Sequence, residues 1–228
     1  MEWIEEAEKD LGTIFSNKDL LRQALTHRSY IYEKNLPEIQ SNEKLEFLGD
    51  TILGFIITNL IYHRFPGLSE GDLSKLRARL VNTAMLAEIA RELHLGRWLL
   101  LGLGEEQSGG REKTSLLANS VEALLGAIFL DQGLEAAREF VLHLFDNRVN
   151  VEVSREVSLD FKTRLQELTA KKFGVTPSYS ISHEEGPDHR KKFYAEVAVG
   201  KAVYGQGKGT SKKEAEQAAA HEALKLLE

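Results

Sequence analysis

The sequence contains no cysteine among its 228 residues. Disulfide bonds and thiolate metal sites are therefore excluded, and this absence is typical of a reducing compartment. The acidic N-terminus, MEWIEEAEKDLG, lacks the basic segment and following apolar run of a secretory signal. The longest apolar run, TILGFIITNLIY, is shorter than the roughly 20 residues that a bilayer requires. We expect a cytoplasmic protein with no membrane partner.

The chain also lacks an excess of positive charge. Its formal net charge is -6, which on its own argues against a polyanionic partner. However, residues 1–154 hold 16 Lys and Arg against 24 Asp and Glu, whereas residues 155–228 hold 13 against 11. This asymmetry indicates two modules with different tasks.

Strand alternation is almost absent from residues 1–150, where helical patterns dominate. A helix is expected behind the cap Asn17, and a strongly apolar one over residues 42–65. A capping box at Ser69 opens a helix that we expect to end at Gly96. Two more apolar helices follow, TSLLANSVEALLGAIFLDQG and LEAAREFVLHLF. The sequence predicts an all-α N-terminal domain.

The pattern changes after residues 151–157, a polar stretch that we interpret as a linker. Within residues 158–228, DFKTRLQELTAKKFG reads as a helix with Asp160 as its cap and Gly174 as its stop. PSYSISHE, KKFYAEVAVG and KAVYGQGKG alternate as strands, and SKKEAEQAAAHEALKLLE is a closing helix. The order α-β-β-β-α predicts a small α+β domain.

Three carboxylates stand at the start of the helix expected over residues 42–65, NEKLEFLGDTILGFIITNLIYHRF. At 100° per residue, Glu43, Glu46 and Asp50 fall within about 60° of one another. Leu53 and Ile57 continue almost the same stripe, so the acids point toward packed protein or a cleft. Unpaired carboxylates there would cost several kcal/mol per ion. They need a cation, and no stretch nearby in sequence offers enough Lys or Arg.

A second apolar helix, LLANSVEALLGAIFL, carries Asn119 and Glu122 on one face. Gly49 and Gly54 on the first helix and Gly126 on the second each cost about 1 kcal/mol relative to alanine. A close helix crossing would explain them, and it would bring the acidic stripe against Asn119 and Glu122.

The resulting cluster of Glu46, Asp50, Asn119 and Glu122 offers only oxygen ligands. Such a set suits Mg²⁺ or Mn²⁺ rather than zinc. An ion of this kind activates a water and stabilises the leaving oxygen in phosphodiester hydrolysis. The same residues could instead form a buried polar network or salt bridge, and their spacing alone does not decide between the two.

NEKLEFLGD followed by TIL resembles the signature of the bacterial ribonuclease III family. ALTHRSY, SEGDLSKLRARLV, LGLGEEQSGGREKTSLLANSVEALLGAIFLDQG and the C-terminal module match in the same order, over nearly the whole chain. The resemblance implies that Glu46, Asp50 and Glu122 are metal-binding and catalytic acids, with Asp50 and Glu122 the least dispensable. It also implies that Glu43 and Glu70 are accessory acids lining the same catalytic valley.

The chain departs from the family at Asn119, where the family usually has Asp. An amide oxygen can still coordinate a hard cation but brings no charge. The substitution could weaken metal affinity or mark an attenuated site. Because Glu122 is present, we expect activity to survive.

The C-terminal module resembles a double-stranded RNA-binding domain. In GKGTSKKEAEQAAA, Ser211, Lys212 and Lys213 stand at the start of the last helix, where backbone N–H groups and two ammonium groups suit a phosphate. Local pairing of these lysines with Glu214 and Glu216 is the alternative.

Two further features favour RNA binding. Thr163, Gln166 and Glu167 lie away from the apolar face of their helix and offer hydrogen-bonding groups to a minor groove. The loop EEGPDHRKK matches the family's loop for a second minor groove, with His189 as the reader. Domains of this kind recognise A-form shape over about 16 base pairs.

These patterns predict an Mg²⁺-dependent endoribonuclease, with Mn²⁺ able to substitute, that hydrolyses double-stranded RNA. Its expected substrates are ribosomal RNA precursors and other structured RNAs. One site cuts one strand and the chain has no repeat, so the resemblance implies a homodimer. The apolar excess on the signature helix would be partly buried at that interface. A duplex-binding protein with a silent site, and an enzyme for one structured RNA, are the alternatives.

Overall fold

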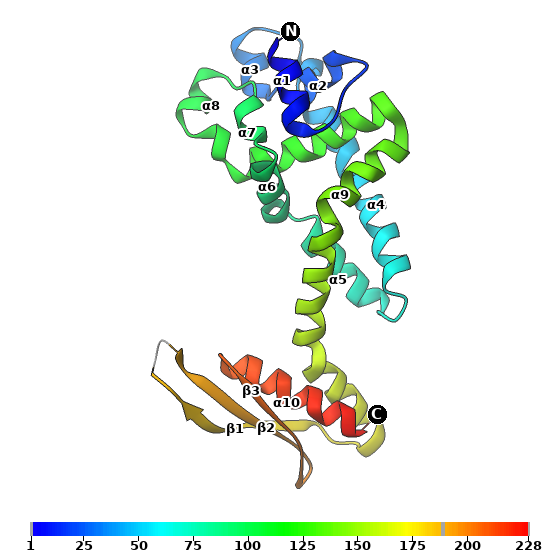
Figure 1. The fold of residues 1–228 in the computed structure, drawn as a ribbon, viewed down its shortest axis with the longest axis vertical. Coiled ribbons are helices and arrows are strands. Elements are labelled where there is room, and N and C mark those ends of the chain that lie inside the picture. Colours follow the sequence, from blue (N-terminus) through cyan, green and yellow to red (C-terminus); the bar gives the residue numbers. More distant parts are fainter. Residues whose placement is uncertain (1, 188–189, 228) are drawn as a thin grey trace. The chain divides into compact units, whose positions relative to one another are not determined.

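A computed structural model describes residues 2–187 and 190–227, and the chain divides into two compact units, Met1–Glu152 and Val153–Glu228. The first unit is helical, as predicted, and Figure 1 labels most of its elements. They are α1 (Glu2–Leu11), α2 (Lys18–Ala24), α3 (Arg28–Glu33), η1 (Glu38–Gln40), α4 (Glu43–Arg64), α5 (Glu70–Leu80), α6 (Thr83–Glu92), α7 (Leu95–Trp98), α8 (Leu103–Gln107), η2 (Gly110–Glu112) and the first part of α9 (Thr114–Phe173).

Side-chain caps define several helix starts in this unit. The Asn17 side chain accepts the Asp19 N–H at 3.1 Å, and Ser69 Oγ accepts the Asp72 N–H at 3.2 Å, as expected of caps. The prediction of a single helix from Ser69 to Gly96 was wrong. The Asn82 side chain accepts the Met85 N–H at 2.9 Å and so starts α6 as a new helix after α5.

The helices α4 and α9 cross at very short range. A Cβ atom on Gly49 would lie 1.7 Å from the carbonyl oxygen of Glu122, and one on Gly126 would lie 2.3 Å from that of Leu45. The close crossing predicted from these two glycines is therefore confirmed. The same reason fails for Gly54, because a Cβ there would meet no atom within 4 Å.

Two helical stretches, Glu43–Arg64 and Thr114–Val153, are long and apolar enough to span a membrane by length and composition alone. The helix α4 has 22 residues, Glu43–Arg64, which agrees with the helix predicted over residues 42–65. In the most apolar 18-residue segment of each stretch, 39% and 56% of the segment is buried, respectively. Because they also pack on each other, we interpret them as core helices.

The element α9 spans three helices that the sequence predicted separately, the last of which was expected to begin at Asp160. Gly133 has φ +87° and ψ -178°, a conformation outside the helical region, so the predicted break at this glycine is confirmed. The predicted cap at Asp160 was wrong, because residues 151–160 are already helical. Gly174, with φ +69°, ends α9 as predicted. The division into domains 1–150 and 158–228 joined by a linker stays a prediction.

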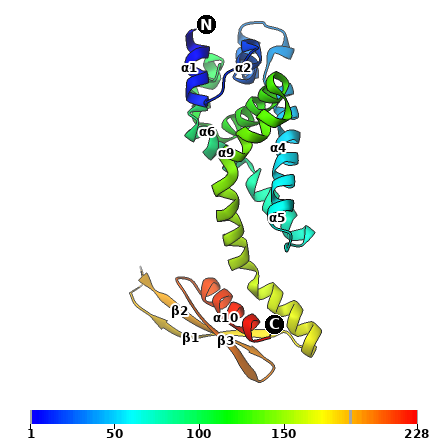
Figure 2. The same ribbon diagram turned by 45° about the vertical axis from the view of Figure 1, so that its right-hand side comes forward.

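The second unit has the predicted α-β-β-β-α order. The end of α9 is followed by β1 (Pro177–Glu185), β2 (Lys192–Val199), β3 (Ala202–Gly209) and α10 (Lys212–Leu227). The strands form an antiparallel sheet in the order β1-β2-β3. Figure 2 shows α10 lying along one face of this sheet.

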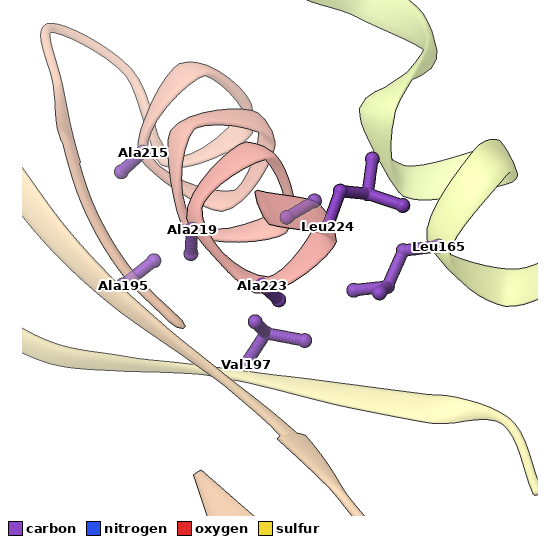
Figure 3. Close-up of a cluster of buried hydrophobic side chains, with 8 residues drawn as sticks. Leu165, Ala195, Val197, Ala215, Ala219, Ala223 and Leu224 are labelled. Carbon is purple, nitrogen blue, oxygen red and sulfur yellow. The ribbon is translucent and has the colours of Figure 1, made fainter. Parts of the chain in front are cut away.

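Small residues set the packing of α10 on the sheet. Figure 3 shows Ala215, Ala219 and Ala223 of α10 turned toward the strands, and Leu165 of α9 beside Leu224. On β3, a Cβ atom at any of three glycines would lie within 2.5 Å of the α10 backbone: Gly205, Gly207 and Gly209. This close approach holds α10 against the sheet from Ala215 to Ala223.

Candidate active site and RNA-binding surface

The crossing of α4 and α9 brings together side chains that are far apart in sequence. Asn119 on α9 hydrogen-bonds to the Glu46 carboxylate on α4, and Glu122 lies within electrostatic reach of Glu46 and Asp50. Glu46, Asn119 and Glu122 are half-buried, whereas Asp50 is exposed. The four side chains are thus neighbours at the helix crossing, and Asp50 is the one that faces solvent.

The carboxylates of this site influence one another through burial and charge. Burial, followed by the charges of Asp50 and Glu46, raises the pKa of Glu122 to about 7 from its usual 4.5. Burial also raises the pKa of Glu46, an effect that the Asn119 hydrogen bond opposes and the charge of Glu43 adds to. These acids therefore gain from a cation placed among them.

The donor set suits a divalent cation. Three carboxylates and an amide oxygen are hard ligands of the kind that Mg²⁺ and Mn²⁺ prefer. In residues 2–187 and 190–227, no three carboxylate or imidazole side chains already converge as a metal-binding group.

The two accessory acids have different surroundings. Glu43 lies beside Glu46 on α4, accepts a hydrogen bond from Ser41 Oγ at 3.3 Å and pairs with Arg28 at 3.5 Å. Glu70 begins α5, is exposed and accepts a hydrogen bond from Ser74 Oγ at 2.9 Å. Among the contacts of the described residues, none joins Glu70 to the other acids.

The predicted RNA-contacting side chains in the second unit are on its surface. On α9, Thr163, Gln166 and Glu167 are exposed while Leu165 between them is buried. The His189 prediction lies outside the described residues.

The start of α10 is built as a capped helix terminus. Ser211 Oγ accepts the Glu214 N–H at 3.2 Å, and the Glu214 carboxylate accepts both the N–H and the hydroxyl of Thr210. The hydrogen bonds from Thr210 lower the pKa of Glu214. Glu214 is therefore engaged by the helix cap.

The lysines at the start of α10 do not pair with Glu214 or Glu216, which was the alternative to phosphate binding. Lys212 pairs with Glu184 of β1 at 3.3 Å, and Glu216 pairs with Lys162 of α9 at 2.6 Å. Lys213 is exposed and forms no ion pair within the described ranges 2–187 and 190–227. Its ammonium group is thus available to a phosphate.

Known proteins match both units. Residues 17–148 match the family model described as Ribonuclease-III-like, which is more than half of the chain. Residues 161–227 match the Double-stranded RNA binding motif. A relative from Thermobifida fusca (strain YX), Ribonuclease 3, is 51% identical over 209 residues, covering 92% of this chain and 86% of the relative. The chain belongs to the ribonuclease III family.

Solved structures agree with this membership. The nuclease domain of ribonuclease III from Campylobacter jejuni superposes with a TM-score of 0.59 and 43% identity, over 65% of this chain and 97% of that one. A second structure of that domain, described for structural flexibility in a region involved in dimer formation, gives a TM-score of 0.58 and 44% identity, over 63% and 96% of the two chains.

Membership of the ribonuclease III family confirms the predicted activity. The protein is an endoribonuclease that acts on double-stranded RNA, and it depends on a divalent metal ion. The helical unit is its ribonuclease III domain, and the α-β-β-β-α unit is its RNA-binding domain.

Sequence reasoning missed two charged residues around these surfaces. Arg28 pairs with Glu43 although 15 positions separate them, and Lys162 pairs with Glu216 across two helices. Nothing in the pattern of the stretch ALTHRSY indicates which acid Arg28 meets.

Proposed function

We propose that Glu46, Asp50, Asn119 and Glu122 hold Mg²⁺, with Mn²⁺ able to substitute, and form the hydrolytic centre of this ribonuclease III. The observation that carries this proposal is the raised pKa of Glu122. Its pKa is raised to about 7 beside Asp50 and Glu46, at a crossing that only glycine permits. Neighbouring carboxylates of which one has a strongly raised pKa are typical of functional sites.

Each side chain has a distinct task in this proposal. When bound, the ion supplies an activated water and stabilises the leaving 3′ oxygen. Asp50, at the exposed side, faces the incoming phosphodiester. Asn119 orients the Glu46 carboxylate through its hydrogen bond. Glu122 holds a proton on its carboxyl group near neutral pH and releases it when a cation enters. Asp50 and Glu122 should be the least dispensable.

The second unit supplies the affinity that an acidic site cannot. We assign duplex contacts to two exposed sets, the α9 face and the start of α10: Thr163, Gln166, Glu167, Ser211, Lys212 and Lys213. His189 is proposed as the reader of the second minor groove. Such domains recognise shape, 2′-hydroxyls and phosphates with little sequence reading. Ribosomal RNA precursors and other structured RNAs in the cytoplasm are therefore the proposed substrates.

We further propose that the protein acts as a homodimer, because cutting both strands of a duplex needs two sites. Three large side chains on one face of α4 are 78%, 58% and 64% exposed: Phe47, Phe55 and Tyr62. At 100° per residue they fall within about 80° of one another. An apolar face of this kind suits a second copy, and the Campylobacter jejuni nuclease domain has a region involved in dimer formation.

The proposal is tested by cleavage of a labelled RNA duplex with Mg²⁺, Mn²⁺ or EDTA. We expect cleavage with either ion and none in EDTA. Glu122→Gln should lose at least about 100-fold, the upper end of the loss when a group that only supports a metal ligand is removed. Glu122→Gln should still bind the duplex. Full cleavage by Glu122→Gln would refute the assigned centre.

A further inference from the structure

Arg28 is a cation at the rim of the acidic site that the proposed mechanism does not use. Its Nη1 lies 3.5 Å from Oε1 of Glu43, one turn before Glu46 on α4. The Arg28 side chain is 69% exposed and that of Glu43 is 43% exposed. Among the ion pairs of the described residues, this is the only one that reaches Glu43, Glu46, Asp50 or Glu122.

The backbone beneath Arg28 is held against the start of α4. The Asn42 N–H donates to the carbonyl of Thr26 at 2.8 Å, immediately before the first turn of α4. On the other side, the His27 N–H donates to the carbonyl of Leu100 at 3.0 Å. Arg28 is therefore fixed at its base relative to the acidic stripe, while its guanidinium can move.

The space around Arg28 is large enough for a segment of RNA backbone. A cavity of about 910 Å³ adjoins it, and its lining includes His27, Ser29, Tyr32, Glu43 and Glu105. Glu105 is engaged by Lys113 at 3.2 Å. Glu38 also lines the cavity, but among the described residues the Arg28 guanidinium forms an ion pair with Glu43 only.

The pair between Arg28 and Glu43 is easily exchanged. Exposed ion pairs contribute little to stability, because water screens them and both side chains lose freedom when they pair. A phosphate offers a guanidinium two parallel charge-assisted hydrogen bonds, which are stronger. An RNA strand that reaches the acidic site must pass a rim carrying Glu43, where a cation is needed to offset repulsion.

We propose that Arg28 leaves Glu43 and binds a backbone phosphate next to the scissile one, which positions the RNA strand over the hydrolytic centre. The ligand is a phosphodiester of duplex RNA, and Arg28 is a substrate-binding residue. This inference rests on the proposed location of the centre at Glu46, Asp50 and Glu122.

The first test measures duplex binding in the Glu122→Gln background of the full chain, over a series of salt concentrations. Arg28→Ala should weaken binding and reduce the slope of log K against log salt by about one, the loss of one phosphate contact. Arg138→Ala is the matched control, since that arginine is 44% exposed and paired with Glu135. It should leave the slope unchanged.

A double-mutant cycle separates phosphate binding from support of Glu43. Glu43→Gln releases Arg28 and should tighten duplex binding, and this gain should shrink several-fold in the Arg28→Ala background. If Arg28 only supports Glu43, the two single variants change binding in the same direction. That result would overturn the proposal.

Cleavage kinetics in the otherwise native chain complete the test. Arg28→Ala should raise KM more than it lowers kcat. Arg28→Lys should restore the salt slope but only part of the change in KM, because lysine cannot form the two parallel hydrogen bonds of a guanidinium. An unchanged slope with native KM in Arg28→Ala would refute the proposal. Failure of the hydrolytic centre would be seen separately, as cleavage that survives Glu122→Gln. Should Arg28→Ala not fold, the Arg28→Lys kinetics and the sign of the Glu43→Gln effect still decide.

Discussion

In the nuclease unit the candidate site is a set of coupled carboxylates at a helix crossing, whereas in the RNA-binding unit it is a set of exposed side chains around two helices. The first depends on backbones that approach closely at Gly49 and Gly126. The second depends on separate groups such as Lys213 that protrude into solvent. Substitutions that disturb packing at the helix crossing should therefore abolish cleavage. Substitutions of single exposed side chains in the RNA-binding unit should each remove only part of the affinity for RNA.

The largest effect should come from closing the space at the crossing. In Gly49→Ala the new Cβ would lie 1.7 Å from the carbonyl oxygen of Glu122, so α4 and α9 must separate. We expect a loss of about 1–3 kcal/mol or more in the free energy of unfolding, as for overpacked cores, together with strongly reduced cleavage. Urea unfolding and duplex cleavage measure the two losses.

The matched control for this change is Gly54→Ala on the same helix. A Cβ at Gly54 meets nothing within 4 Å, so alanine should raise stability by up to about 1 kcal/mol through helix propensity. Equal stability losses at both glycines would show that the crossing does not set the geometry of the site.

A smaller effect is expected from restoring a charge at the centre. Asn119→Asp replaces an amide ligand by a carboxylate, so the Mg²⁺ concentration for half-maximal cleavage should fall by about 10-fold, the lower end of typical changes around metal ligands. Without metal, the variant loses the hydrogen bond to Glu46 and gains repulsion. Its melting temperature in EDTA should therefore fall. An unchanged Mg²⁺ requirement would contradict the role of Asn119 as a ligand.

The stability of the metal-free protein should depend on pH through Glu122. Its pKa is about 7 in the folded protein against a usual 4.5, so between these values the folded state binds more protons than the unfolded state. In EDTA the free energy of unfolding should accordingly decrease as pH rises from about 4.5 to 7. Glu122→Gln should flatten this slope, and added Mg²⁺ should reverse the loss above pH 7. Urea unfolding at several pH values, with native chain beside variant, checks the prediction.

The crossing of α4 and α9 could be predicted from the sequence, because a glycine inside an apolar helix is costly unless another backbone approaches it. The same reasoning misjudged Gly54, since a costly glycine in a helix need not mark a contact. It also joined α5 and α6, because the capping role of Asn82 depends on a backbone turn that the apolar pattern does not reveal.

Pairings between distant segments could not be read from the sequence. Arg28 meets Glu43 because the Thr26 carbonyl binds the Asn42 N–H, a contact between loops without periodicity. Lys212 meets Glu184 because of where β1 ends relative to α10, which local charge spacing does not specify. Long-range ion pairs therefore required the fold.

The smallest effect should come from a single exposed lysine of the RNA-binding unit. Lys213→Ala should weaken duplex binding a few-fold and lower the slope of log K against log salt by about one, while kcat at saturating RNA stays native. Lys225→Ala, on the same helix but 56% exposed and paired with Glu222, should leave that slope unchanged. If Lys213→Ala also lowers kcat, then the two units do not divide affinity and chemistry between them, because an exposed ammonium group would then contribute to the hydrolytic step itself.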